Sequence, residues 1–149
     1  MSEAGVPGVA DPGARVVRIA HQKGIEVSPM VGPSSILLAI MGAGLNGQSF
    51  AFKGYLSPKR PELAKDLKKL ENHSARTGET QVFIETPYRN MAFFETALQT
   101  LSASSLLTVA TDLTLPTQYI RTFSIMEWQR IKKPELHKRP TVFLLQGNR

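Results

Sequence analysis

The chain has 149 residues, 42% of them hydrophobic, which is enough for one folded domain or for a small domain joined to part of another. Because it contains no cysteine, disulfides, thiolate metal sites and cysteine nucleophiles are excluded. No apolar run is long enough to cross a bilayer and no secretory signal pattern is present, so we expect a soluble cytoplasmic protein without membrane contact.

The formal net charge is +6, from 18 basic and 12 acidic residues. This excess of positive charge favours attraction to polyanions such as RNA. Many proteins with no nucleic-acid role are equally basic, so the charge alone leaves RNA binding open.

The first elements are a Gly/Pro-rich loop and a helix. Asp11 suits the N-cap, Pro12 suits the first helical position, and Gly24 suits the position after the helix. Four apolar residues form one face at helical spacing: Val16, Val17, Ile19 and Ala20. Residues 25–30 (IEVSPM) then predict a short strand.

A second apolar helix is predicted for residues 36–41, after the chain-breaking pair Gly32-Pro33. Three glycines follow it at positions 42, 44 and 47 and are typical of a linker. We therefore place a domain boundary here, with residues 1–45 in the C-terminal part of a first domain and residues 46–149 in a second.

The remaining chain alternates between strand and helix patterns, which predicts an α/β fold. The expected strands are residues 50–56, 80–85, 106–111, 118–128 and 140–147, and the expected helices are residues 57–73 and 87–101.

Five segments in order resemble motifs of the tetrapyrrole methylase superfamily. They are residues 2–13 (SEAGVPGVADPG), 31–45 (VGPSSILLAIMGAGL), 52–59 (FKGYLSPK), 82–90 (VFIETPYRN) and 109–114 (VATDLT). Within this superfamily, they are similar to the branch that contains ribosomal RNA small subunit methyltransferase I.

The resemblance implies a two-domain α/β methyltransferase with a mixed sheet in its second domain. Such enzymes hold S-adenosylmethionine (AdoMet) between the domains and commonly form homodimers. The family's first domain begins with a strand and loop that this sequence does not show, so we expect the chain to start inside that domain. The implied activity is 2′-O-methylation of a cytidine in small-subunit ribosomal RNA, with that RNA or the small ribosomal subunit as partner.

The resemblance also implies the cofactor contacts. From the first domain they are Glu3, Ala4, Gly5 and Val6, through close backbone approach, and Ser34 and Ser35 near the carboxylate end of AdoMet. The open alternatives are a tight Gly/Pro connection for the loop and ordinary helix capping for the serines.

From the second domain, the implied contacts to adenine and ribose lie where strands end. They are Glu85, Thr86, Leu113, Thr114, Pro140 and Thr141. Ligands of open α/β sheets bind outside strand ends. Glu85 has an alternative role as an acid favoured by a helix start.

The candidate RNA contacts are Lys53, Lys59, Arg60 and Arg89. The alternatives are a solvated basic face for the first three and an ion pair with Glu85 for Arg89. No general base is identified, because none of the three histidines lies in a catalytic constellation, and no metal-ligand spacing occurs.

The sequence departs from the branch at Thr111, Asp112 and Tyr88, where the branch has Arg, Glu and His. These departures keep two alternatives open. One is methylation of a corrin or porphyrin precursor, and the other is a diverged, non-catalytic RNA-binding homologue.

Overall fold

The computed structural model describes residues 6–148 and divides the chain into two compact units, Met1–Ser35 and Ile36–Arg149. Within the described range, none of the helices is both long and apolar enough to span a membrane.

The described part of the N-terminal unit contains one helix, α1 (Ala14–Gln22), with Gly13 as its N-cap. It therefore starts later than the predicted Asp11-Pro12 start, whereas Gly24 follows the helix at φ 65° as expected. The predicted strand over residues 25–30 is wrong, because this segment has no regular structure. A strand needs a neighbour for its N–H and C=O groups, and none lies beside it among residues 6–35.

The second unit contains five strands and four helices within its described residues. They are α2 (Ser35–Ala43), β1 (Phe50–Tyr55), α3 (Arg60–Thr77), β2 (Thr80–Ile84), α4 (Asn90–Thr100), β3 (Leu106–Thr111), β4 (Tyr119–Ser124), α5 (Ile125–Arg130) and β5 (Thr141–Gln146).

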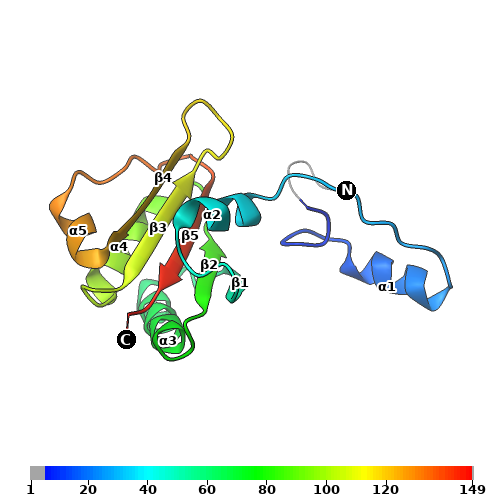
Figure 1. The fold of residues 1–149 in the computed structure, drawn as a ribbon, viewed down its shortest axis with the longest axis horizontal. Helices are drawn as coiled ribbons and strands as arrows, with labels where there is room; N and C mark the ends of the chain where they lie inside the picture. Colours follow the sequence, from blue (N-terminus) through cyan, green and yellow to red (C-terminus); the bar gives the residue numbers. More distant parts are fainter. Residues whose placement is uncertain (1–5, 149) are drawn as a thin grey trace. The chain divides into compact units, whose positions relative to one another are not determined.

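The strands form one mixed sheet in the order β1-β2-β5-β3-β4 (Figure 1). β1 pairs parallel with β2, while β5 pairs antiparallel with both β2 and β3, and β4 pairs antiparallel with β3. The last strand of the chain therefore lies in the middle of the sheet. The predicted α/β fold with a mixed sheet is confirmed.

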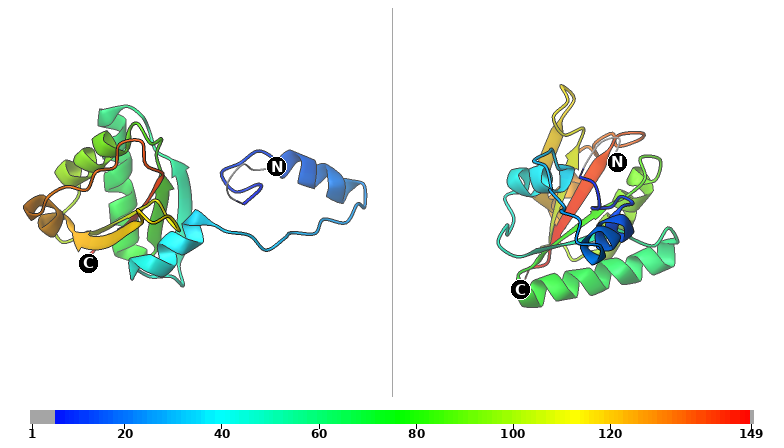
Figure 2. Two further views of the ribbon diagram at one scale, coloured as in Figure 1. Left: turned by 90° about the horizontal axis from the view of Figure 1, so that it is seen from above. Right: turned by 90° about the vertical axis from the view of Figure 1, so that its right-hand side faces the viewer.

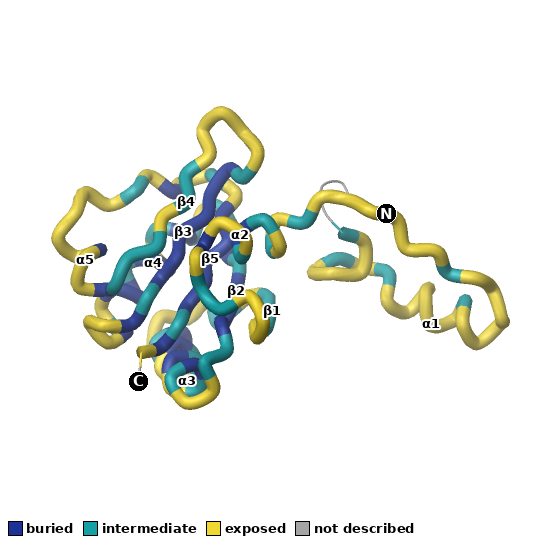
Figure 3. The backbone as a smooth tube through the Cα atoms, viewed as in Figure 1, coloured by how far each residue is buried: buried dark blue, intermediate teal, exposed yellow. Residues whose placement is uncertain are grey.

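Helices cover both faces of the sheet (Figure 2). α3, α4 and α5 pack on one face, where the cluster includes Leu67, Phe94 and Trp128. α2 packs on the other through Ala39 and Ala43. Side chains alternate along β5 because a strand has a period of two: Phe143 and Leu145 join the first cluster, and Val142 and Leu144 the second. Figure 3 shows the resulting buried positions along β3 and β5.

Two predictions concern the start of this unit: the burial of the helix over residues 36–41 and the position of the domain boundary. The helix over residues 36–41 is only half-buried, because Met41 is 79% exposed while Ala39 is fully buried. The contacts of α2 attach it to the sheet of the second unit. The domain boundary between residues 45 and 46 stays a prediction.

Among the elements predicted for residues 46–149, three differ from the structure in their bounds by more than one residue. The pattern over residues 118–128 splits into β4 and α5, because Ser124 and Glu127 form a capping box that starts a helix. α4 begins at Asn90 and not at Pro87, since residues 87–89 form a turn before it. α3 ends at Thr77, where Gly78 adopts φ 75° as a left-handed cap.

Candidate functional site

The ends of several strands meet at one edge of the sheet. β1, β2 and β3 run in the same direction, so their carboxyl ends share this edge, and antiparallel β5 begins there. We call it the strand-end edge and define it as Glu85, Thr86, residues 112–114 and residues 139–141. All six sequence-predicted contacts from the second unit belong to it.

Backbone hydrogen bonds tie the loops of this edge together. The amide of Asp112 donates to the carbonyl of Pro140 at 3.0 Å, which joins the end of β3 to the start of β5. The amide of Lys138 donates to the carbonyl of Pro87 at 3.0 Å, which joins the same segment to the loop after β2. The three strand ends are therefore held in a fixed relation.

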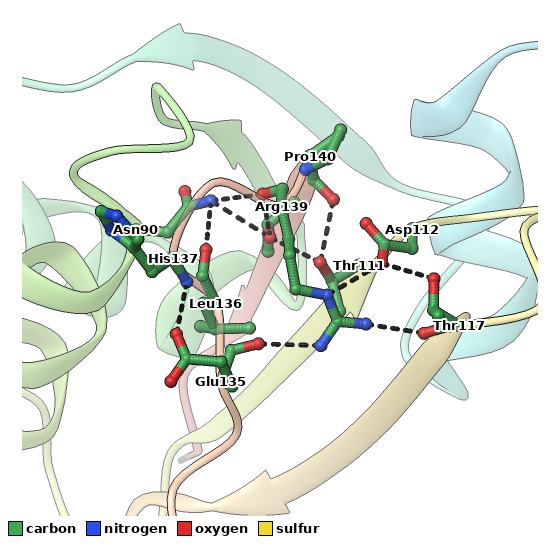
Figure 4. A network of polar contacts seen from close by, with 10 residues as sticks. Asn90, Thr111, Asp112, Thr117, Glu135, Leu136, His137, Arg139 and Pro140 are labelled. Atoms are coloured by element: carbon green, nitrogen blue, oxygen red, sulfur yellow. Dashed lines mark hydrogen bonds and ion pairs between the residues drawn. The ribbon is translucent and has the colours of Figure 1, made fainter.

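Buried hydroxyl and amide groups stiffen the start of β5. Thr141 Oγ1 lies 2.8 Å from Thr111 Oγ1, which in turn donates to the Pro140 carbonyl at 2.9 Å. Asn90 Nδ2 donates to the Arg139 carbonyl at 2.7 Å and to Thr141 Oγ1 at 3.2 Å (Figure 4). Asn90 is fully buried, and its Oδ1 has no hydrogen-bond partner among residues 6–148.

Asp112 is held by Arg139 and Thr117 at the end of β3. Its Oδ2 accepts hydrogen bonds from Arg139 Nε at 2.8 Å and from Thr117 Oγ1 at 2.7 Å. Burial by itself raises the pKa of the Asp112 carboxyl, but these two hydrogen bonds and the guanidinium charge outweigh it, so the pKa lies below its usual value. Asp112 is therefore a structural anion at neutral pH.

Glu85 is paired within its own turn. Its Oε1 accepts from the amide of Thr86 at 2.6 Å and forms an ion pair with Arg89 Nη2. Arg89 Nε also donates to Thr86 Oγ1 at 3.2 Å. Of the two roles left open for Arg89, the structure shows the ion pair. Both carboxylates of the strand-end edge are thus neutralised by an arginine.

The backbone of this edge is unusual at two positions. Asp112 has φ 51° and Thr114 has φ 71°, in the left-handed region that residues with a side chain seldom adopt. The amide of Thr114 is bonded to Gln118 Oε1 at 2.8 Å. Strained residues of this kind cluster at ligand sites.

Three of the four candidate RNA contacts lie outside the strand-end edge, while Arg89 is bonded to Glu85 and Thr86 of that edge, and each of the four has a polar partner. Lys53 lies 3.7 Å from Glu79, and Lys59 lies 3.4 Å from Glu62. Arg60 Nε donates to Thr96 Oγ1 at 3.3 Å. Arg60 and Arg89 both line a cavity of about 240 Å³ next to Glu85.

The sequence-predicted contacts of the N-terminal unit lie partly outside the described residues. Glu3, Ala4 and Gly5 lie outside the described residues, and Val6 is the first described residue, with its carbonyl accepting from Val9 at 3.1 Å. Ser35 is the first residue of α2, as expected for a serine at a helix start. These contacts stay predictions.

Three residues that sequence reasoning did not select hold the strand-end edge: Asn90, Asp112 and Arg139. The sequence offered one signal for each of two of them: Asp112 departs from a motif of the branch, and Arg139 directly precedes the predicted contacts Pro140 and Thr141. Among residues 6–148, no group of three or more His, Asp or Glu side chains could hold a metal ion.

No family model matches the chain, but several curated sequences do. A ribosomal RNA small subunit methyltransferase I of Vibrio cholerae is 32% identical over 127 residues, covering 85% of this chain and 43% of the relative. The protein of the same name from Xylella fastidiosa is 33% identical over 150 residues, covering 99% of this chain and 53% of the relative. The chain spans about half the length of these curated relatives.

Solved structures share the fold. The methyltransferase CobJ matches with a TM-score of 0.59 and 23% identity, covering 96% of this chain and 62% of that one. The uroporphyrin-III C-methyltransferase of Thermus thermophilus, solved with S-adenosyl homocysteine, matches with a TM-score of 0.52 and 16% identity, covering 95% of this chain and 62% of that one. At these identities the likeness shows the architecture alone.

Proposed function

This chain belongs to the tetrapyrrole methylase superfamily, and from that premise we propose that it is part of an AdoMet-dependent methyltransferase acting on small-subunit ribosomal RNA. The name of the curated relatives, ribosomal RNA small subunit methyltransferase I, supports the RNA as substrate. The Thermus thermophilus neighbour, which was solved with S-adenosyl homocysteine, supports the cofactor. The finer assignment, a cytidine ribose 2′-oxygen as acceptor, rests on the resemblance of the motifs.

The observation that carries this proposal is the strand-end edge, where three loops are tied together and both carboxylates are already paired with arginines. An edge without uncompensated charge suits the adenine and ribose of AdoMet, which are uncharged and need hydroxyl and backbone partners. The exposed Thr114 and Pro140 and the half-buried Thr86 are accessible to such a ligand. The edge therefore fits the adenosine part of the cofactor.

AdoMet and the protein chain contribute different parts of the reaction. AdoMet, when bound, supplies an activated methyl group together with its own leaving group. The chain's part is to bind and orient it, with Thr86, Leu113, Thr114 and Thr141 at the adenosine. Glu85 and Pro140 belong to the same contact surface.

The remaining contacts are proposed from the motifs alone. Glu3, Ala4, Gly5 and Val6 would approach the cofactor through their backbone, and Ser34 and Ser35 would receive its carboxylate. A homodimer is proposed on the same basis, and so is a place in the cytoplasm.

Calorimetric titration of AdoMet into the chain tests the cofactor assignment. We expect binding that weakens when Thr114 or Thr86 is replaced by alanine. The control is Ser104→Ala, in an exposed turn before the start of β3 and therefore at the other end of the strands. Equal AdoMet affinity in all three variants would contradict the placement of the cofactor at the strand-end edge.

Transfer of a labelled methyl group from AdoMet to small ribosomal subunits tests the substrate. Labelling of the ribosomal RNA supports the proposal, and mapping the label to a ribose supports the finer assignment. Labelling of a corrin or porphyrin precursor alone would favour that alternative. RNA binding without any AdoMet dependence would favour a non-catalytic homologue.

A further inference from the structure

A second cavity lies between β1 and α3, away from the strand-end edge, with which it shares no lining residue. Its volume is about 450 Å³, within the range of roughly 300–1,000 Å³ that is common for small-ligand sites. Six of its lining residues carry the argument: Lys53, Tyr55, Lys69, His73, Arg76 and Gln81. We call the cavity lined by these six residues the nucleotide pocket.

The nucleotide pocket is rich in positive charge. Lys53, Lys69 and Arg76 line it together with His73, against a single lining carboxylate, Asp66. Glu79, which does not line the pocket, holds two of these side chains, since its Oε1 lies 3.7 Å from Lys53 Nζ and 3.2 Å from His73 Nε2. Such a wall suits an anion, and phosphate is one of the anions that Lys and Arg side chains recognise through charge-assisted hydrogen bonds.

Gln81 adds an acceptor that lacks a partner. This residue is fully buried, and its Nε2 donates to the Glu79 carbonyl at 3.0 Å and to Glu79 Oε1 at 2.8 Å. Rotating the amide would set its oxygen against these two acceptors, so the orientation is fixed by the network. Gln81 Oε1 has no hydrogen-bond partner within the described part of the chain. A buried amide oxygen of this kind favours a ligand that donates a hydrogen bond.

Tyr55 supplies an aromatic wall. Gly54 before it has φ 66° and accompanies a break in the β1–β2 register between Phe52 and Tyr55. A bulge of this type re-aims the side chain that follows it. Tyr55 is 58% exposed and lines the pocket, so its ring is available for stacking against a planar group.

A phosphate, a hydrogen-bond donor and a planar ring occur together in a nucleotide whose base carries an amino group. We propose that the nucleotide pocket binds one such nucleotide of a single-stranded RNA segment, an inference that rests on the proposed function for its RNA partner. Lys53, Lys69 and Arg76 receive the phosphate, Tyr55 stacks on the base, and Gln81 Oε1 accepts from its exocyclic amine. The site would hold a segment of the RNA substrate without taking part in the chemistry.

Titrations followed by amide chemical shifts test this with cytidine 5′-monophosphate, uridine 5′-monophosphate, cytidine and inorganic phosphate as probes. We expect cytidine monophosphate to bind most tightly and to shift the amides of β1 and α3. We expect Lys69→Ala to weaken it about tenfold, as loss of one close phosphate contact does. The matched control is Lys65→Ala, which removes an exposed lysine of the same helix that does not line the pocket.

A second pair of variants tests the base. Gln81→Met, which keeps the length of the side chain, should abolish the preference for cytidine over uridine monophosphate, and Tyr55→Leu should weaken both about tenfold. A cytidine-containing oligonucleotide should compete with the mononucleotide for the same amides, which identifies RNA as the source of the ligand. If only the free mononucleotide binds, the RNA assignment is overturned.

Equal weakening by Lys65→Ala and Lys69→Ala would overturn the proposal, because it would show general attraction to a basic helix. So would shifts confined to the strand-end edge. These probes are used without AdoMet, so a failure here leaves AdoMet binding and methyl transfer to be judged by their own assays.

Discussion

Arg139 Nε lies 2.8 Å from Asp112 Oδ2, and this ion pair joins the end of β3 to the start of β5. Only 8% of Asp112 is exposed, and Arg139 also donates to the carbonyls of Thr117 and Glu135. The guanidinium therefore ties the loop between β3 and β4, through Asp112 and Thr117, to the segment that precedes β5. At the position of Asp112 the branch that the motifs resemble carries a glutamate, so this chain keeps an acidic side chain, although a shorter one.

Removal of Arg139 should destabilise the fold and loosen the strand-end edge. Arg139→Ala leaves the Asp112 carboxylate nearly buried without its cation, and we expect a loss of about 2 kcal/mol in the free energy of unfolding. Urea denaturation measures this, with Lys132→Ala as the control because Lys132 is exposed and has the same charge. An unfolding midpoint equal to that of the unmodified chain would show that the pair is dispensable.

Glu71 should be the most costly carboxylate of α3 to remove. It is 4% exposed and accepts hydrogen bonds from the Ser102 amide at 2.6 Å, from Ser105 Oγ at 2.6 Å and from Lys68 Nζ at 2.8 Å. Glu71→Ala leaves these donors unpaired and should lower the free energy of unfolding by about 2–3 kcal/mol. Glu62→Ala on the same helix, where the side chain is exposed, should cost under about 1 kcal/mol. Similar losses in the two variants would contradict the anchoring role of Glu71.

The same carboxylate should contribute to acid sensitivity. Burial alone raises the pKa of Glu71, but hydrogen bonds from Lys68, Ser105 and Ser102 and the Lys68 charge lower it below its usual value. Because the folded-state pKa is depressed, its stabilisation is present above the unfolded pKa of about 4.3 and is lost as pH falls through the folded value. Denaturation series from pH 7 to pH 3 should thus show a shallower loss for Glu71→Gln than for the unmodified chain. Parallel curves would contradict the shift.

Gly147 should tolerate no side chain. A Cβ at this position would clash with the Glu71 carbonyl oxygen and lie 2.9 Å from the Ala75 nitrogen, both backbone atoms of α3. Since a helix backbone cannot yield easily, Gly147→Ala should cost about 1–3 kcal/mol. Gly47→Ala is the control, because its Cβ would meet only Ile40 Cγ2 at an ordinary 3.6 Å. Thermal melts compare the two, and an unchanged melting temperature for Gly147→Ala would refute the close approach.

Thr114 should be a position where stability and binding conflict. Its φ of 71° is left-handed, so Thr114→Gly relieves strain and should raise the free energy of unfolding by about 1 kcal/mol. At the same time it removes a hydroxyl from the proposed AdoMet contact, and titration should show weaker binding. A variant that is both less stable and equally tight in binding AdoMet would contradict both parts.

Much of the candidate site could be predicted from the sequence, because strand ends are encoded locally. The runs before Glu85 and Leu113 and after Pro140 have the apolar and β-branched composition of buried strands, and each ends at a turn pattern. The resemblance of five ordered motifs supplied the fold and the class of chemistry. The partners within the site could not be predicted: Asp112 and Arg139 are 27 residues apart, and nothing local pairs them.

By itself the sequence determined the secondary-structure pattern of the second unit, because apolar periodicity and turn residues act over a few neighbouring positions. Tertiary structure alone decided the rest. It placed β5 between β2 and β3, it left residues 25–30 without regular structure, and it split residues 118–128 between β4 and α5. Strand order and buried pairs such as Glu71 with Ser105 depend on contacts between distant segments, and these form only when the whole sheet and its covering helices are packed together.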